Sequence, residues 1–211
     1  IARSAVNSAS HVIAQVNPRV PRTHGDSFIH SSQFDAMVFT DEPLHAAGAP
    51  AQLTAEEMKI GEHIAPLVSD RSTLQLGIGC IPDAVCKFLT NHKDLGVHTE
   101  MFSDGLIELC EKGVVTNKYK SIHPNKTVSG FAFGTTKLYD YVDDNPAFAF
   151  LDIDYVNEPS VIKRNKKVVA INSAVEIDIT GQVCSDSIGT YQYSGIGGQM
   201  DFIRAASLSE D

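Results

Sequence analysis

The chain has 211 residues, of which 43% are hydrophobic and 20% are charged, and its formal net charge is −9. This composition is typical of a soluble globular protein with a well-formed core. The negative charge argues against a nucleic-acid or anionic-membrane surface, and no apolar run approaches the ~20 residues of a membrane-spanning helix.

The first part of the chain is predicted to form a unit separate from the rest. Residues 12–16 have the pattern of a strand, and residues 41–53 are rich in Pro, Gly and Ala, as a connector is. Residues 54–57 (TAEE) then match a capping box, with apolar residues at helical spacing behind it. We therefore predict a domain boundary near residue 50, which divides the chain into residues 1–50 and 51–211.

Strand and helix patterns alternate through the second part. Strands are predicted at residues 73–77, 95–99, 127–134, 148–153 and 168–179, and helices at residues 82–89, 104–113 and 135–142. This alternation predicts an α/β fold with an open, largely parallel sheet and helices on its faces. Ligands of such sheets bind at the carboxyl ends of the strands.

Glycines gather at the turn between the first of these strands and its helix, in the sequence Gly77-Ile78-Gly79-Cys80-Ile81-Pro82. The segment is not a dinucleotide fingerprint, because proline holds the third glycine position, and no Gly-Lys-Ser/Thr follows as in a phosphate-binding loop. Two interpretations stay open: a purely structural turn, or backbone N–H groups that meet an anion or an oxyanion.

Two further segments are rich in small residues. Three glycines, Gly195, Gly197 and Gly198, occur within four positions and indicate either a tight turn or the close approach of a ligand. Residues 134–137 (GTTK) could hold a phosphate, but a capped helix with an exposed lysine is the commoner arrangement.

Two polar residues stand near predicted strand ends. Glu100 follows the strand at residues 95–99; in isolation it is a solvated residue, but a carboxylate is also an accepted covalent nucleophile. Asn172 interrupts an apolar strand, where its amide is either satisfied structurally or directed at a transition-state oxygen. His98 shares a strand face with Glu100, and a packed core histidine is the favoured interpretation.

Metal and disulfide chemistry are not expected. The cysteines form no C-x-x-C pair, and neither they nor the histidines have the spacing of zinc ligands. Reduced, buried thiols and a reducing compartment follow as the default.

Four separated motifs resemble the acetyl-CoA hydrolase/transferase family of family I CoA-transferases, particularly its 4-hydroxybutyrate, butyrate and acetate CoA-transferase branch. They are LQLGIGCIPDAV, GVHTEMFSDG, INSAVEIDITGQVCSDSIG and YSGIGGQMDFIRAAS, in that order. Members of this family are considerably longer and have two α/β domains, so the chain is expected to be part of a longer protein. Residues 1–50 would end the first domain and form a linker, and residues 51–211 would form the C-terminal domain without its last segment. A minor departure is Arg204-Ala205, where the family usually has Arg-Gly.

The resemblance implies roles for individual residues. Within His98-Thr99-Glu100-Met101, Glu100 would be the catalytic glutamate, and Asn172 would face the reacting carbonyl. Residues 77–81 would contact CoA and help to form the oxyanion site. The glycines at 195, 197 and 198 would lie along the bound CoA.

The implied reaction is CoA transfer between a short-chain acyl-CoA and a carboxylic acid through a glutamyl-CoA thioester. No permanently bound cofactor, nucleic acid or membrane is implied, and the resemblance allows a homodimer. Relatives in eukaryotes are usually mitochondrial, so we expect that compartment, with the cytoplasm as the alternative. Three other functions stay open: an acetyl-CoA hydrolase that uses the same glutamate, a non-catalytic CoA-binding protein, and a sugar-phosphate isomerase.

Overall fold

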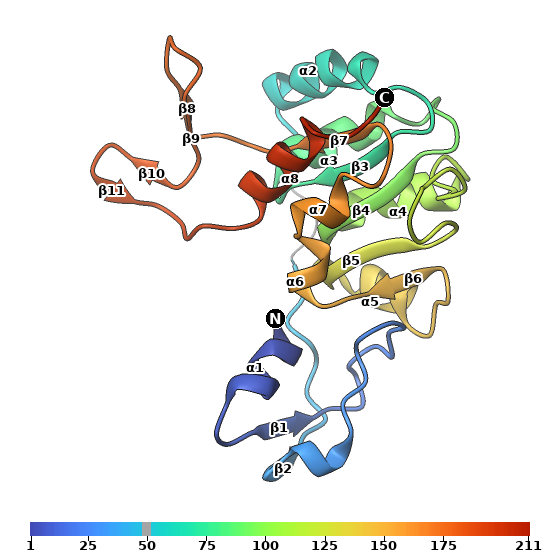
Figure 1. The fold of residues 1–211 in the computed structure, drawn as a ribbon, viewed down its shortest axis with the longest axis vertical. Helices are drawn as coiled ribbons and strands as arrows, with labels where there is room; N and C mark the ends of the chain where they lie inside the picture. The colour runs from blue at the N-terminus through green and yellow to red at the C-terminus, as the bar shows by residue number, and fades with distance from the viewer. Residues whose placement is uncertain (48–51) are drawn as a thin grey trace.

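A five-stranded parallel sheet forms the centre of the molecule. The computed structural model describes residues 1–47 and 52–211. The sheet has the order β6-β5-β4-β3-β7 (Figure 1). Its strands are β3 (Thr73–Leu76), β4 (Gly96–Phe102), β5 (Thr127–Ala132), β6 (Phe148–Phe150) and β7 (Val168–Ile171), and every pair is parallel. The predicted open parallel α/β sheet is confirmed.

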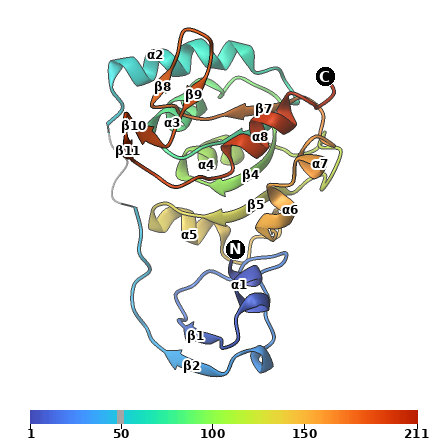
Figure 2. The ribbon, with the colours of Figure 1, turned by 60° about the vertical axis from the view of Figure 1, so that its left-hand side comes forward.

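Helices cover both faces of this sheet (Figures 1 and 2). On one face lie α2 (Ala55–Ile64), α3 (Cys80–Phe88), α4 (Asp104–Glu111), α5 (Thr136–Val142) and the short 3₁₀ turn Ala65–Leu67. On the other lie α6 (Ile153–Val156), α7 (Pro159–Ile162) and α8 (Gln199–Ala206). Each layer buries its own apolar cluster, the larger beneath α2–α5 and the smaller beneath α6–α8. Burial of these two clusters holds the layers together.

Local sequence signals set the beginnings of several helices. The capping box at α2 is present, because the Glu57 amide donates to Thr54 Oγ1 at 3.2 Å and the Thr54 amide donates to Glu57 Oε2 at 2.7 Å. Helix α3 begins at Cys80, slightly before the predicted start, so Pro82 stands within its first turn, where no backbone donor is required.

The strand order reverses between β3 and β7. From β3 the chain proceeds through β4 and β5 to β6 on one side, and it then returns to place β7 on the other side of β3. In open α/β sheets, a ligand crevice forms at the carboxyl ends of the strands at such a reversal. The turn after β3 and the residues after β7 both lie at this point.

The N-terminal segment lies beside β6, at the opposite edge of the sheet from β7 (Figure 1). It contains α1 (Ala2–Ser8), the parallel pair β1 (Ile13–Val16) and β2 (Ala36–Phe39), and a 3₁₀ turn at Ser31–Gln33. Gly25 forms a bridge with Phe150 of β6, and Tyr139 Oη donates to the His45 carbonyl at 2.8 Å. The predicted boundary near residue 50 falls within residues 48–51, which lie outside the described residues, and it stays a prediction.

Residues 173–197 form an arm that extends away from the sheet (Figure 1). The arm has two short antiparallel hairpins, β8 (Glu176–Ile177) with β9 (Val183–Cys184) and β10 (Ser187–Ile188) with β11 (Tyr191–Gln192). The prediction of one strand over residues 168–179 is therefore wrong: β7 ends at Ile171 and a separate strand begins at Glu176. The alternating pattern of residues 175–179 predicts a strand with one buried side, but neither side is buried. Ile177 is 65% exposed, and Glu176 and Asp178 are exposed as well.

The described residues contain no helix long and apolar enough to cross a membrane.

Candidate active site

Glu100 lies within β4, which was predicted to end at Thr99 but continues to Phe102. Its carboxylate is directed to the face of the sheet that α6–α8 cover. There the backbone N–H of Gly198 donates to Glu100 Oε2 at 3.0 Å, across 98 residues of sequence. Gly198 is the N-cap residue of α8, so the carboxylate lies at a helix N-terminus, which favours negative charge. The two motifs that sequence analysis singled out thus meet at one atom.

Residue 198 must be a glycine if this contact is to form. A Cβ atom at this position would lie 2.3 Å from Glu100 Oε2 and 2.5 Å from Asn157 Nδ2, well inside van der Waals distance. The side chains of Glu100 and Asn157 therefore converge on the bare Cα of Gly198. This explains the third glycine of the segment as a site of close approach rather than a tight turn.

Asn157 is a site residue that the sequence analysis missed. It follows α6 as its C-cap residue, and its Oδ1 is buried without a hydrogen-bond partner among the described residues. A buried amide oxygen without a partner costs free energy unless a ligand or water satisfies it. No sequence signal marks this residue, because it lies 57 positions from Glu100 along the chain and in no recognisable motif.

His98 is a packed core histidine, as favoured from the sequence. Its Nε2 lies 2.9 Å from the Val156 carbonyl and its ring packs edge-to-face on Phe202. Burial lowers the pKa of His98 to about 4, so the imidazole is neutral near pH 7 and Nε2 carries the hydrogen. His98 therefore places β4 against α6 and α8 and adds no charge next to Glu100.

The turn after β3 has one amide that is hydrogen-bonded and two that have no acceptor among the described residues. The Gly77 amide donates to the Ile171 carbonyl at 2.8 Å and so extends the pairing of β3 with β7. Among the described residues, the Ile78 and Gly79 amides have no acceptor, so these two are the donors left for a ligand. Gly79 has φ +123°, a backbone conformation that only glycine adopts at low cost, and it leads directly into α3.

Asn172 lies at the same corner and is held by a neighbouring amide. Its Nδ2 donates to Gln75 Oε1 at 2.8 Å, and its Oδ1 accepts from Gln75 Nε2 at 3.1 Å. A Cβ on Gly77 would lie 2.9 Å from Asn172 Oδ1, so this glycine also permits a close approach. These two hydrogen bonds leave one N–H of Asn172 without an acceptor among the described residues. They also fix the orientation of the Asn172 side chain at the point where the strand order reverses between β3 and β7.

In the described part of the chain, the side chains and glycines of the other predicted site residues form no hydrogen bond with Glu100 or Asn172. Gly195 and Gly197 are exposed in the arm, and a Cβ on either would meet no atom within 4 Å. The Ile78 side chain is exposed, and Ile81 is half-buried in the first turn of α3. The negative charge of Glu57 raises the pKa of the Cys80 thiol, which keeps it protonated and makes it a poor nucleophile.

The segment at residues 134–137 begins helix α5 and has an exposed lysine, as in the commoner of the two interpretations, but the Thr135 side chain forms no hydrogen bond that caps the helix. Asp104 Oδ2 accepts a hydrogen bond from the Thr135 amide at 2.8 Å, and Asp104 Oδ1 accepts from Thr135 Oγ1 at 2.5 Å. A carboxylate thus occupies the place that a phosphate would need. Lys137 is exposed and pairs with Glu111 at 3.3 Å.

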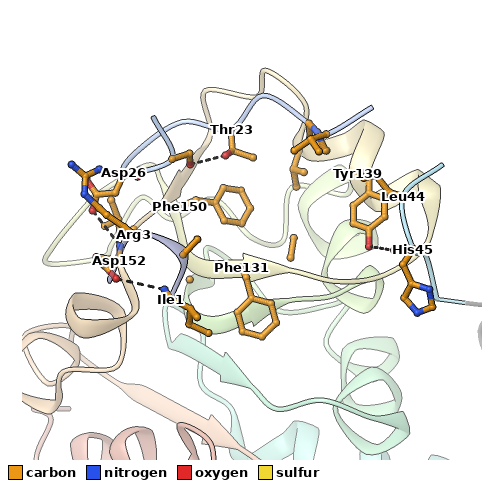
Figure 3. A pocket seen from close by; sticks show the side chains of 18 residues that line it. Ile1, Arg3, Thr23, Asp26, Leu44, His45, Phe131, Tyr139, Phe150 and Asp152 are labelled. Carbon is orange, nitrogen blue, oxygen red and sulfur yellow. Dashed lines mark hydrogen bonds and ion pairs between the residues drawn. The ribbon is translucent and has the colours of Figure 1, made fainter. Parts of the chain in front are cut away.

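A cavity of about 500 Å³ lies between the N-terminal segment and the carboxyl ends of β5 and β6 (Figure 3). Phe131, Phe150 and Tyr139 give it apolar walls, and Arg3 and Asp26 stand at its rim. Neither Glu100 nor Asn172 lines it. Elsewhere in the described residues, no group of three or more His, Cys, Asp or Glu side chains is placed to hold a metal ion.

The geometry defines a class of site. The Glu100 carboxylate, held by the Gly198 amide, lies towards the carboxyl ends of the parallel strands. The Ile78 and Gly79 amides and the oriented side chain of Asn172 lie at the same edge of the sheet. A nucleophile next to preformed hydrogen-bond donors is the arrangement that acyl transfer requires.

The chain belongs to the acetyl-CoA hydrolase/transferase family. The model of this family's C-terminal domain matches residues 134–211. The succinyl-CoA:acetate/propanoyl-CoA:succinate CoA transferase of Fasciola hepatica is 53% identical over 212 residues, covering 100% of this chain and 44% of the relative. The 4-hydroxybutyrate coenzyme A transferase of Clostridium kluyveri is 53% identical over 208 residues, covering 99% and 48%.

Solved structures give the same result. RipA from Yersinia pestis superposes with a TM-score of 0.91 at 40% identity, covering 98% of this chain and 47% of that one. Relatives named acetyl-CoA hydrolase are more distant: that of Kluyveromyces lactis is 36% identical over 140 residues, or 64% of this chain. The chain spans about half the length of the curated relatives that it matches.

Proposed function

We propose that the protein containing this chain transfers CoA between a short-chain acyl-CoA and a carboxylic acid, with Glu100 as the covalent catalyst. The observation that carries the proposal is the position of the Glu100 carboxylate, 3.0 Å from the Gly198 amide at the N-terminus of α8. A nucleophilic carboxylate must be ionised, and a hydrogen bond from a backbone N–H stabilises the ionised form.

The reaction has two exchanges. Glu100 attacks the acyl-CoA carbonyl, the carbon–sulfur bond breaks, and the CoA thiolate leaves an acyl-glutamyl anhydride behind. The thiolate then attacks the glutamyl carbonyl carbon, the bond to the acyl carboxylate breaks, and the first acid leaves. A glutamyl-CoA thioester remains, and an acceptor carboxylate reverses the two steps.

Separate donors serve the two carbonyl groups in this scheme. The Ile78 and Gly79 amides and the remaining N–H of Asn172 stabilise the oxyanion of the acyl group. The Gly198 amide, which already binds Glu100 Oε2, stabilises the oxyanion that forms on Glu100 when the thiolate attacks. A preformed donor is valuable here because it requires no reorganisation as the charge develops.

Transfer is preferred over hydrolysis. The transferases match this chain over its full length at 53% identity, whereas the hydrolases match part of it at lower identity. The two activities are separated by measuring acyl-CoA consumption with and without acetate or butyrate. Consumption that does not depend on the added acid would identify a hydrolase.

The decisive experiment replaces Glu100 by glutamine in the full-length protein. The variant is expected to lose exchange of label between acyl-CoA and free acid by at least about a thousandfold, because an amide cannot form the anhydride. Glu111→Gln, the same substitution on an exposed residue of α4, is the matched control. Mass spectrometry of the wild-type protein incubated with acyl-CoA should place the CoA adduct on Glu100; an adduct on another residue contradicts the proposal.

We further propose a homodimer, a mitochondrial location and no permanently bound cofactor. These properties rest on the family resemblance alone. Sedimentation of the full-length protein, fractionation of the source cells and mass spectrometry of the native protein test them in turn.

A further inference from the structure

A cationic cavity lies at the amino edge of the sheet, on a chain whose net charge is −9. Residues 163–167 (KRNKK) contain four cationic side chains, and three of them, Lys163, Arg164 and Lys166, line a cavity of about 540 Å³. Among the described residues, Lys166 pairs with Glu210 at 3.7 Å, whereas Lys163 and Arg164 have no carboxylate within 4 Å. Two cations are therefore available to an anion.

Hydrogen bonds to the main chain fix the walls of this cavity. Asn165 is fully buried, and its Oδ1 accepts from the Ile122 amide at 3.3 Å, which joins the two loops that flank the cavity. The Lys167 amide donates to the Glu210 carbonyl at 2.7 Å and secures the segment after α8. The cations thus stand on a braced backbone rather than on a loop tip.

Two titratable groups near the cavity add little charge to it. Lys120 is buried next to Ser121 in sequence, and its Nζ donates to the Val97 and Lys126 carbonyls at 2.8 and 2.7 Å. Burial lowers the pKa of this ammonium group to about 7, so it is only partly charged near pH 7. Burial, followed by the charges of Lys120 and Arg164, lowers the pKa of His123, so its imidazole is neutral there. The positive charge of the cavity therefore comes from the exposed cations that line it.

Helix α8 connects this cavity to the candidate active site. Its N-cap residue is Gly198, whose amide binds Glu100, and the residues that follow its end include Leu208, which lines the cavity. Figure 1 shows α8 running from the side of the arm towards the C-terminus at the other edge of the sheet. Eight residues at 1.5 Å each give the helix a length of about 12 Å.

The exposed side of α8 combines apolar residues with one cation, Arg204. Met200 is 72% exposed and Ile203 is 44% exposed, and residues three apart lie on the same side of a helix. The pantetheine arm of CoA carries methyl groups that suit the apolar part of this surface, between Gly198 and the cavity. A thiol at Glu100 and a phosphate group at the cavity are then the two ends of one molecule.

We propose that Lys163, Arg164 and Lys166 bind the phosphate groups of the CoA substrate. The inference rests on the proposed function for the identity of the ligand. A guanidinium group binds phosphate through paired hydrogen bonds and an ammonium group binds it as a point charge, so the two cation types suit a substrate with several phosphates. Remote binding of this kind positions the thioester at Glu100.

The test compares two substrates in the full-length protein. Acetyl-pantetheine has the same reacting end as acetyl-CoA but no phosphate. In the double variant Lys163→Ala/Arg164→Ala, the KM for acetyl-CoA is expected to rise at least about tenfold, which corresponds to about 1.4 kcal/mol for the two substitutions together. The kcat/KM for acetyl-pantetheine and the KM for the acid should stay within about twofold of the wild-type values, since neither substrate reaches the cavity.

The double variant Lys112→Ala/Lys137→Ala removes two exposed cations, one directly after α4 and one in α5, and serves as the charge-matched control. An unchanged KM for acetyl-CoA in the cavity variant would mean that the phosphates bind elsewhere. Equal losses with acetyl-CoA and acetyl-pantetheine would assign the lysine and arginine a structural role or a macromolecular partner instead. If the wild-type protein lacks transferase activity, the proposed function fails, and calorimetric titration with CoA and with pantetheine still decides the cavity's role.

Discussion

Replacing Gly198 by alanine is expected to slow CoA transfer without unfolding the protein. The new Cβ would lie 2.3 Å from Glu100 Oε2 and 2.5 Å from Asn157 Nδ2. Both atoms end flexible side chains, so the overlap is relieved by moving the carboxylate rather than the backbone. The hydrogen bond from the Gly198 amide is then lost, at a cost of about 1.5–3 kcal/mol for a charged acceptor. This corresponds to a decrease in kcat of about 10- to 100-fold.

The assay is kcat at saturating acyl-CoA and acid, with thermal unfolding of the same preparations. Gly197→Ala is the matched control, because a Cβ at that position meets no atom within 4 Å and kcat should stay within about twofold of wild type. A Gly198→Ala variant with wild-type kcat would refute the role of the amide. So would an equal loss in both variants, because only one of the two glycines contacts Glu100.

Three further predictions concern the stability of the fold and the role of Asn172 as a hydrogen-bond donor. Asn172→Ala leaves the buried amide of Gln75 without its partner, so the free energy of unfolding should fall by about 1–3 kcal/mol in urea titrations, and kcat should fall as well. Burial lowers the pKa of His98 from 6.5 to about 4, so the unfolded chain binds a proton at this residue before the folded protein does as the pH falls. The free energy of unfolding should therefore drop by up to about 3 kcal/mol between pH 6.5 and pH 4. The His98→Asn variant should not show this drop. Thr54→Ala breaks the capping box with Glu57 and should cost about 0.5–2 kcal/mol, seen as a lower Tm with unchanged kcat.

The sheet was predictable because its signals are local. Each of the strands β3, β4 and β5 is followed closely by a helix with a clear apolar side, and short connections of this kind imply parallel strands. The end of β4 was harder to place. Thr99 Oγ1 donates to the carbonyls of Leu76 and Met101, each at 3.1 Å, and the strand continues past Glu100 to Phe102. A polar residue in a strand interior resembles a strand end when only the sequence is available.

The layer formed by α6–α8 was not predicted, for a different reason. Helices α6 and α7 have four residues each, which is too short for a helical period to be visible. Helix α8 has eight residues, but Phe202 and Ala205 are its buried ones, and the glycines before it indicate a loop. In the arm at residues 173–197, by contrast, the sequence predicted regular structure that is absent. The alternating pattern at its start matches a half-buried strand, although both sides are exposed.

Whether Glu100 is a solvated residue or a nucleophile could not be decided from its own neighbourhood in the sequence. The deciding contact comes from Gly198, 98 residues away, and α8 brings that amide to the carboxylate by burying Phe202 against His98. The sequence does not distinguish Gly195, Gly197 and Gly198, but only Gly198, at the start of α8, closely approaches other side chains. The motifs therefore predict which segments meet, whereas the packing of α8 on β4 selects the atoms that can react. A change that loosens this packing, even far from Glu100 in sequence, should for that reason reduce catalysis before it reduces the content of secondary structure.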